Sequence, residues 1–142
     1  GLDGGISSHY DTDDSDGCMA QKIYCPVPDC SSSIPFNRNG DFPLYGVDIF
    51  TTDVEVRAAA DGEVVHLTDH TLHDYRVIIK HSSEATTLYT LSVSNVSVGD
   101  IVSAGDVIGS TQEGFVHIEY APSGLTSNIK RLIDPSPCFH DA

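Results

Sequence analysis

The chain has 142 residues, which fits one domain that is large enough to bury a hydrophobic core. Seven Lys and Arg stand against 21 Asp and Glu, so the formal net charge is −14. A surface this negative repels phosphate groups, which excludes nucleic acid as a partner and disfavours anionic lipid. Because no run of about 18 apolar residues occurs, insertion into a membrane is not expected.

Four cysteines, Cys18, Cys25, Cys30 and Cys138, point to the compartment of the protein. An even number in a small acidic chain is typical of two disulfides and an oxidising environment, so we expect a secreted protein. The alternatives are a zinc knuckle or free cytosolic thiols, and the absence of a Cys-x-x-Cys pair disfavours zinc. The sequon that begins at Asn95 is a candidate glycosylation site and a weak second sign of secretion.

Residues 1–41 differ in composition from the remainder of the chain. They contain clusters of Gly, Ser, Pro and Asp together with three of the four cysteines, and they lack the apolar periodicity of a helix or a central strand. This pattern predicts an irregular N-terminal arm over residues 1–41 that is tethered by disulfides. A β domain is predicted over residues 42–142.

The second part of the chain is a series of short runs rich in Val, Ile, Thr and Tyr, separated by Gly, Asp, Asn and Ser. Their spacing of roughly 8–12 residues predicts an all-β sandwich or barrel. One short helical turn is predicted near Ser127–Ile133, because Asp134-Pro135 would end it. The predicted strands are Val54–Arg57, Glu63–Leu67, Arg76–Lys80, Thr86–Leu91, Ile101–Val102, Val107–Ser110 and Phe115–Tyr120.

Two segments, Val56–Leu67 and Val96–Ser110, carry a more specific pattern. The second contains Gly99-Asp100 and Gly105-Asp106 six residues apart, which predicts two tight turns with positive φ between short strands. This pattern resembles the barrel-sandwich folds of biotinyl or lipoyl carrier domains and of lysostaphin-type (LytM-like) zinc endopeptidases.

A carrier domain must present a lysine at the tip of a hairpin for covalent attachment. The lysines of this chain are Lys22, Lys80 and Lys130, and none lies midway between matching halves of the pattern. The carrier interpretation is therefore rejected.

The endopeptidase family matches ordered motifs along roughly residues 42–137. Its His-x-Gly-x-Asp opening resembles Leu44–Asp48, and its Ala-rich start of the barrel-sandwich pattern resembles Arg57–Gly62. Its Leu-Tyr-x-His-Leu strand resembles Leu88–Leu91, its His-x-His strand resembles Phe115–His117, and its closing Asp-Pro-x-Pro resembles 134–137. The resemblance implies an all-β, barrel-sandwich domain of the duplicated hybrid motif type.

In that family a His, an Asp and the second His of His-x-His hold zinc, and two further His act on the attacking water. The matching positions here are Leu44, Asp48 and His117 for the metal, and Thr90 and Phe115 for catalysis. Leucine has no lone pair to offer, and neither Thr nor Phe acts as a base near neutral pH. With two of five groups retained, the resemblance implies a catalytically inactive protein that needs no cofactor and binds zinc weakly at most.

Two other interpretations remain open at this stage. His70 and His73 lie in a loop that could reach the rim of the site and supply a replacement ligand, or they are solvated loop residues. Asp48 and His117 could be kept only because they hydrogen-bond each other, which is a common structural feature.

The N-terminal arm resembles one group within this fold, the vertebrate leukocyte cell-derived chemotaxins. The shared residues are Cys18, the pair in Cys25–Cys30, the Gly-Val-Asp of 46–48 and the Val-His-Ile-Glu of 116–119. Further half-cystines of that group are missing here. The resemblance therefore implies the pairs Cys25–Cys30 and Cys18–Cys138.

These observations favour a binding module, and we expect a lectin that recognises a carbohydrate or glycoconjugate in or near the former active-site cleft. Aromatic rings pack on sugar C–H groups, and carboxylates accept hydroxyl hydrogen bonds. The alternatives are a chemotaxin-like ligand of a receptor protein and a residual zinc endopeptidase. A homodimer would supply the two sites that crosslinking needs. The candidate ligand-binding residues are Asp48, His117, Tyr45, Tyr89, Phe115 and Tyr120.

Overall fold

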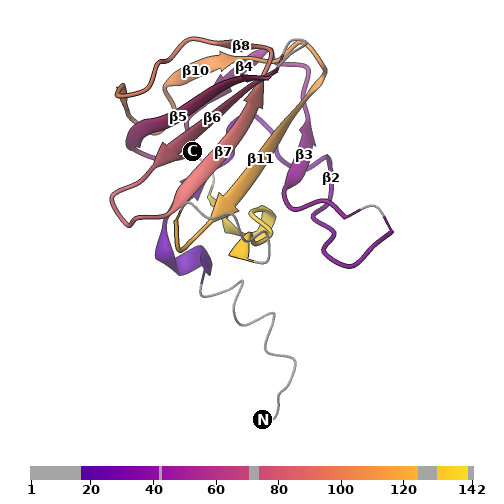
Figure 1. Cartoon of the computed structure of the whole chain (residues 1–142). Coiled ribbons are helices and arrows are strands. Elements are labelled where there is room, and N and C mark those ends of the chain that lie inside the picture. The colour runs from indigo at the N-terminus through magenta and orange to yellow at the C-terminus, as the bar shows by residue number, and fades with distance from the viewer. Residues whose placement is uncertain (1–16, 42, 71–73, 125–130, 141–142) are drawn as a thin grey trace.

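The computed structural model describes residues 17–41, 43–70, 74–124 and 131–140, and these residues form mainly β-strands (Figure 1). The described elements are β1 (Ile23–Tyr24), β2 (Ser33–Ile34), β3 (Val47–Phe50), β4 (Glu55–Arg57), β5 (Gly62–His70), β6 (Asp74–Lys80), β7 (Thr86–Leu91), β8 (Val93–Ser94), β9 (Ile101–Val102), β10 (Val107–Ser110), β11 (Phe115–Ala121), the 3₁₀ helix η2 (Ser136–Cys138) and β12 (Phe139–His140).

Seven strands form the main sheet, in the order β2-β3-β11-β7-β6-β5-β9. A smaller sheet, β4-β10-β8, lies over one end of it in Figure 1, and β1 pairs with β12 in a third. Within the described part of the chain none of the three sheets closes on itself. The arrangement is the expected all-β fold, with open sheets that enclose the hydrophobic core between them.

Alternation along β11 decides which side chains are inside. Val116, Ile118 and Tyr120 are fully buried, whereas His117 and Glu119 lie on the opposite face and are partly exposed. A shift of one residue would move the buried set into solvent, so the hydrophobic pattern fixes the register of this strand. Because β11 lies between β3 and β7, its outward residues lie in the middle of a sheet face.

The two predicted Gly-Asp turns are confirmed. Gly99 and Gly105 have φ values of 98° and 88°, and in each turn the Asp carboxylate accepts a hydrogen bond from the backbone N–H of the serine three residues earlier. Residues that carry a side chain rarely adopt this backbone conformation, so glycine is required at both positions.

The predicted strand runs correspond to β4, β5, β6, β7, β9, β10 and β11, three of them with the same bounds. Five strands were not among the predictions, namely β1, β2, β3, β8 and β12. Each is short, and β3 contains an Asp, which is depleted in strands, so local composition gives little signal there. The predicted helical turn near Ser127–Ile133 lies mostly outside the described residues.

One disulfide ties the N-terminal arm to the β domain, and a second closes a loop within the arm. Cys18 is bonded to Cys138 across 120 positions of sequence, and Cys25 is bonded to Cys30. These are the pairs that the chemotaxin resemblance implied. The described part of the arm is not wholly irregular, because β1 pairs in parallel with β12 and β2 adds an edge strand to the main sheet. No helix in the described ranges is both long and apolar enough to cross a membrane.

A chain of hydrogen bonds crosses the core. His81 Nδ1 lies 2.7 Å from the backbone oxygen of Asp61, and its Nε2 lies 2.9 Å from Thr87 Oγ1. Thr87 in turn lies 2.7 Å from the Tyr89 hydroxyl, which accepts the backbone N–H of Ala59. Because a carbonyl only accepts, neutral His81 carries its proton on Nδ1, so Thr87 donates to Nε2 and Tyr89 donates to Thr87.

Candidate functional site

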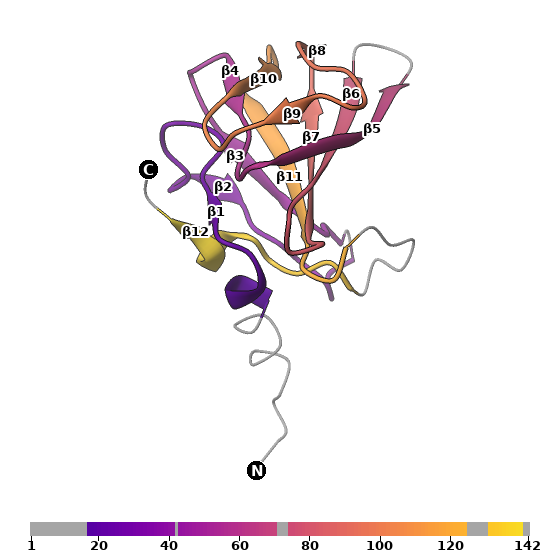
Figure 2. The same ribbon diagram turned by 90° about the vertical axis from the view of Figure 1, so that its left-hand side faces the viewer.

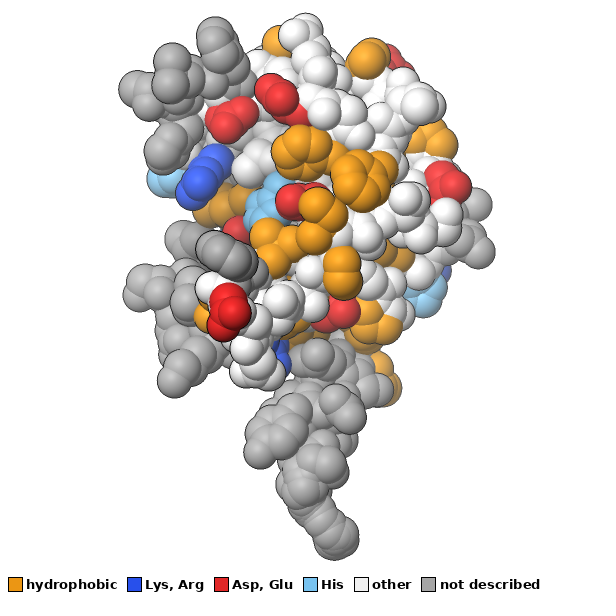
Figure 3. Space-filling model, turned by 90° about the vertical axis from the view of Figure 1, so that its right-hand side faces the viewer, with side chains coloured by type: hydrophobic (Ala, Val, Ile, Leu, Met, Phe, Trp, Pro, Cys, Tyr) orange, Lys and Arg blue, Asp and Glu red, His pale blue; other side chains and the backbone are white. Residues whose placement is uncertain are grey.

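The candidate site lies on the outer face of the main sheet, where β3 and β11 pair. Asp48 is directly opposite His117 in the ladder. The Oδ1 atom of Asp48 lies 2.6 Å from Nδ1 of His117, and Oε2 of Glu119 lies 2.8 Å from the Nε2 atom. We call these three residues the outer-face triad. Figure 3 shows this face, on which hydrophobic side chains gather beside histidine and acidic side chains.

Both ring nitrogens of His117 therefore face a carboxylate oxygen. The three side chains are only 16–27% exposed, so the hydrogen bonds are partly shielded from water. Burial disfavours a charged ring, but the hydrogen bonds to Glu119 and Asp48 outweigh it and raise the pKa of His117 above its usual value. Only the doubly protonated ring can donate to both carboxylates, so the triad is built to hold an imidazolium between two anions.

Two neighbours constrain His117, one at its ring and one at its backbone. Gly46 passes so close to the ring that a Cβ at this position would lie 2.9 Å from Cε1 of His117. Thr90 Oγ1 accepts the backbone N–H of His117 at 3.3 Å and so contacts the main chain rather than the ring. The glycine of the sequence motif therefore has a steric role, because any side chain there would displace the ring or β11.

The donor set at this site does not fit a catalytic zinc. Such a site needs three protein ligands that converge on one point, but the two carboxylates bind opposite nitrogens of one imidazole and do not converge. Leu44, at the first ligand position, forms a backbone bridge with Asn37 and has an aliphatic side chain. Nowhere among the described residues do three or more His, Cys, Asp or Glu side chains stand where they could hold a metal ion.

Apolar side chains border the triad. Phe115 is directly opposite Phe50 in the β11–β3 ladder, and Ile34 of β2 is directly opposite Asp48. The exposed fractions of Ile34 and Phe50 are 47% and 45%, which is high for large apolar residues. The ring of Tyr45 packs edge-on against Phe36, with 6.2 Å between centroids. The outer face therefore combines ionised groups with exposed apolar surface.

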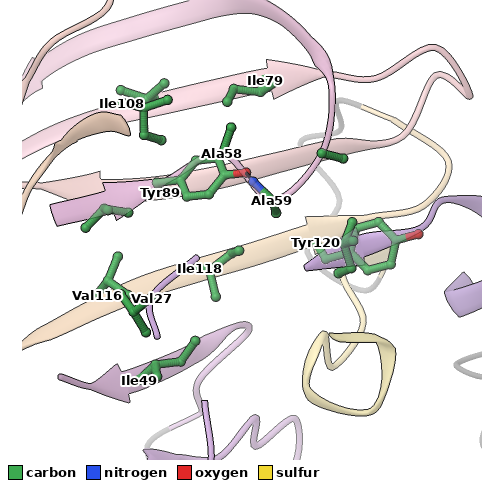
Figure 4. Close-up of a cluster of buried hydrophobic side chains, with 14 of the residues drawn as sticks. Val27, Ile49, Ala58, Ala59, Ile79, Tyr89, Ile108, Val116, Ile118 and Tyr120 are labelled. Atoms are coloured by element: carbon green, nitrogen blue, oxygen red, sulfur yellow. Dashed lines mark hydrogen bonds between the residues drawn. The ribbon is translucent and has the colours of Figure 1, made fainter. Parts of the chain in front are cut away.

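The structure corrects two of the expected lining residues. Tyr89 and Tyr120 are fully buried, and their side chains point into the core rather than to the outer face (Figure 4). The hydroxyl of Tyr89 is engaged with Ala59 and Thr87, and that of Tyr120 donates to the backbone oxygen of Gly17. Desolvation by burial raises the pKa of both phenols to about 12. Neither tyrosine can contact a ligand at the triad.

Three residues near the site were not among the candidates. Glu119 is two positions after His117, so strand alternation alone places both on one face. Phe50 shares a face with Asp48 for the same reason. Arg76 is directly opposite Thr90 in the β6–β7 ladder and adds a cation to this face, which only the strand register shows. The side chain of His70 and the whole of His73 lie outside the described residues.

Comparison with known proteins gives two kinds of match. The model of Peptidase family M23 matches residues 43–124, which include Asp48, Thr90, His117 and Glu119. No curated protein matches the chain in sequence. Solved structures share the fold at low identity.

The catalytic domain of the antimicrobial peptidase lysostaphin from Staphylococcus simulans is 24% identical, with a TM-score of 0.57, and the match covers 82% of this chain and 88% of that one. The match to a longer lysostaphin chain, also 24% identical, covers 73% of this chain but only 46% of the relative. A zinc-containing peptidase from Vibrio cholerae is 21% identical, with a TM-score of 0.54 and coverage of 70% and 36%.

A chain of the SpoIIQ–SpoIIIAH pore-forming complex is 20% identical, with a TM-score of 0.63 and coverage of 84% and 92%. All these likenesses are below 25% identity and concern the fold alone. The family match spans more than half of the chain, and it contains the paired Asp48 and His117. This chain belongs to peptidase family M23.

Proposed function

We propose that this chain is a secreted, catalytically inactive member of the M23 family that acts as a lectin and binds carbohydrate at the outer-face triad. The observation that carries the proposal is the closed hydrogen bonding of His117 between Asp48 and Glu119. A ring that gives both nitrogens to carboxylates has no lone pair left for a metal or a water proton. The same arrangement presents polar groups to a ligand.

The loss of catalysis is supported by the side chains around the triad. Leu44, Thr90 and Phe115 occupy the three other positions at which the family resemblance requires histidine. A hydrolytic site needs a Lewis acid or a general base near the attacked carbonyl. An aliphatic chain, a hydroxyl and a phenyl ring supply neither, so we expect no hydrolysis.

Recognition of sugar is supported by the remaining lone pairs and by the apolar border. Oδ2 of Asp48 and Oε1 of Glu119 have no hydrogen-bond partner among the described residues. Charged acceptors of this kind bind the hydroxyl groups of a sugar well. Phe50 and Phe115 lie on the same face and offer rings against which C–H groups can pack.

Secretion is supported by the two disulfides and by the position of the sequon. All four cysteines are joined in disulfides here, one within the arm and one between the arm and the domain. The cytosol keeps thiols reduced, so disulfides are typical of secreted proteins. Asn95 is exposed directly after β8, so an attached glycan would extend into solvent. We therefore expect Asn95 to be glycosylated when the chain is made by a secretory cell that performs this modification, which mass spectrometry of the secreted protein would reveal.

The proposal is tested by binding of the full chain to a glycan array, followed by inhibition with free sugars. Asp48→Asn and Ile34→Ala should each weaken binding of the sugar selected on the array. We expect Asp48→Asn to lower the affinity by about tenfold or more, because a charged hydrogen bond is lost. Matched controls are Asp69→Asn and Ile101→Ala, which alter an exposed Asp and an exposed Ile away from the triad. Thermal unfolding of all four variants shows which remain folded.

Three outcomes would contradict the proposal. If no saccharide binds while the protein binds cell-surface protein receptors, the chemotaxin-like alternative is favoured. If the purified chain takes up stoichiometric zinc and cleaves glycine-rich peptides in a chelator-sensitive manner, it is an enzyme. If a sugar binds but Asp48→Asn and Ile34→Ala behave like their controls, the sugar site lies elsewhere on the molecule.

A further inference from the structure

A cavity of about 800 Å³ lies beside the N-terminal arm and shares no residue with the outer-face triad. Its walls come from β1, β12, the Cys25–Cys30 loop and the turn between β9 and β10. Figure 2 shows β1 and β12 side by side on this part of the molecule. The lining residues with polar or aromatic side chains include Tyr24, Asp29, Arg57, Phe139 and His140.

The walls are held rigidly, so the cavity is preformed. The Cys25–Cys30 bond closes the loop that forms one wall, and the Cys18–Cys138 bond anchors the chain directly before β12. The backbone N–H of Tyr24 donates to Ala59, and that of Arg57 donates to Pro26, which ties the loop to the β domain. A site that is already ordered loses little entropy when a ligand binds.

Several polar groups in this cavity have no hydrogen-bond partner among the residues that the structure describes. The hydroxyl of Tyr24 and the ring nitrogens of His140 make no hydrogen bond to any described residue, although the two rings pack edge-on with centroids 6.1 Å apart. The guanidinium of Arg57 donates to Glu55 and to the backbone oxygen of Gly105, which leaves further N–H groups for a ligand.

Charged groups of both signs border the cavity. Arg57 and Asp29 line it, Arg57 pairs with Glu55, and the ammonium of Lys22 lies over the ring of Tyr24. The hydrogen bond from Ser31 lowers the pKa of Asp29, so its carboxylate stays ionised. A site that offers both donors and acceptors beside aromatic rings favours a neutral molecule with many hydroxyl groups over an anion or a cation.

We propose that this cavity is a second binding site, which takes a neutral saccharide. Its volume lies within the range of small-molecule sites, and its aromatic walls suit the C–H face of a sugar ring. The site goes beyond the proposed lectin site at Asp48 and does not depend on it. With both sites active, one chain would bind two sugars.

The test is a titration of the ¹⁵N-labelled full chain with galactose, glucose and N-acetylglucosamine, followed by NMR. At least one sugar should shift the backbone signals of Tyr24, Gly105 and Phe139 together along one saturating curve. Glucuronic acid and glucosamine should bind these residues more weakly. Tyr24→Phe, which removes one hydroxyl, should weaken binding here about five- to tenfold, whereas the matched Tyr75→Phe, on β6, should leave it unchanged.

The result separates this proposal from the lectin proposal. Saturable shifts at the cavity that persist in Asp48→Asn support a second site, even if the triad binds nothing. Shifts confined to residues around Asp48 and His117 would overturn the second site while leaving the first intact. The second site is also overturned if no neutral sugar shifts these signals at its solubility limit, if charged sugars bind more tightly, or if Tyr24→Phe has no effect.

Discussion

Asp48 and His117 lie directly opposite each other on β3 and β11, with 2.6 Å between Oδ1 and Nδ1. In the family chemistry implied by the motifs, these two residues would both serve a metal ion. Here each is the other's partner, and Glu119 takes the second ring nitrogen. The two retained residues therefore form a charged hydrogen-bonded unit together with a residue that strand alternation adds.

This unit makes the titration of His117 the most direct measurement of the site. The hydrogen bonds from the ring to Glu119 and Asp48 raise its pKa against the opposing effect of burial. Asp48→Asn removes one of the two anions, so the pKa of His117 should fall, because a close opposite charge that favours the protonated ring is lost. The measurement is the pH dependence of the imidazole ring signals by NMR.

Asp69→Asn serves as the control for that shift. It removes the same charge from an exposed position on β5 and keeps both carboxylates of the triad. The geometry described for the triad would be wrong if the two variants changed the titration of His117 equally, because long-range charge rather than direct hydrogen bonding would then set its pKa.

His81 should make the fold sensitive to acid. Desolvation by burial lowers its pKa, so the unfolded chain takes up a proton before the folded chain does. The free energy of unfolding should therefore decrease as the pH falls below about 6.5, with a slope of up to about 1.4 kcal/mol per pH unit. His117 has the opposite effect, because its pKa is raised in the folded chain. Its contribution to stability is fully present below about pH 6.5, the pKa of an unfolded histidine, and is lost at higher pH.

Urea unfolding between pH 7 and pH 5 in wild type and in His81→Gln tests this prediction. The variant should be less stable at pH 7 by roughly 1–2 kcal/mol, because the hydrogen-bond chain is disturbed, but its stability should depend less on pH. His66→Gln, at an exposed position on β5, should keep the slope of the wild type. An unchanged slope in His81→Gln would show that other groups cause the acid sensitivity.

The Cys18–Cys138 disulfide should contribute strongly to stability, because it joins residues 120 positions apart. In the chain-entropy model a loop of this size stabilises the fold by roughly 4–5 kcal/mol, less any strain. The double variant Cys18→Ser with Cys138→Ser should lower the free energy of unfolding by about that amount. The matched variant without Cys25 and Cys30, which close a loop of five positions, should lose less.

Gly46→Ala should damage the site and the fold together. The added Cβ would meet the backbone oxygen of Ile118 as well as the ring of His117, and backbone cannot move aside easily. We expect a loss of about 1–3 kcal/mol, as for overpacked positions, with altered ring signals of His117. Gly99→Ala is the control, because its Cβ would meet no atom within 4 Å and only its positive φ opposes the change. It should leave the His117 signals as they are.

The sequence by itself determined the fold class, the Gly-Asp turns and most of the long strands. These features depend on contacts between neighbours in the chain: alternation of Val, Ile and Tyr with polar residues for β11, and positive φ for Gly99 and Gly105. The ordered motifs then fixed which residues stand at the family positions, so that Asp48 and His117 were identified before their geometry was known.

Only the tertiary structure decided which face of each strand is buried and which partners the side chains take on neighbouring strands. Tyr89 and Tyr120 are aromatic residues beside the motifs, but strand parity turns both into the core. Asp48 meets His117, and Arg76 reaches the neighbourhood of the triad, through the pairing of strands that are distant in sequence. Hydrogen-bond partners across a sheet depend on register between strands, a property that no segment of the chain carries alone.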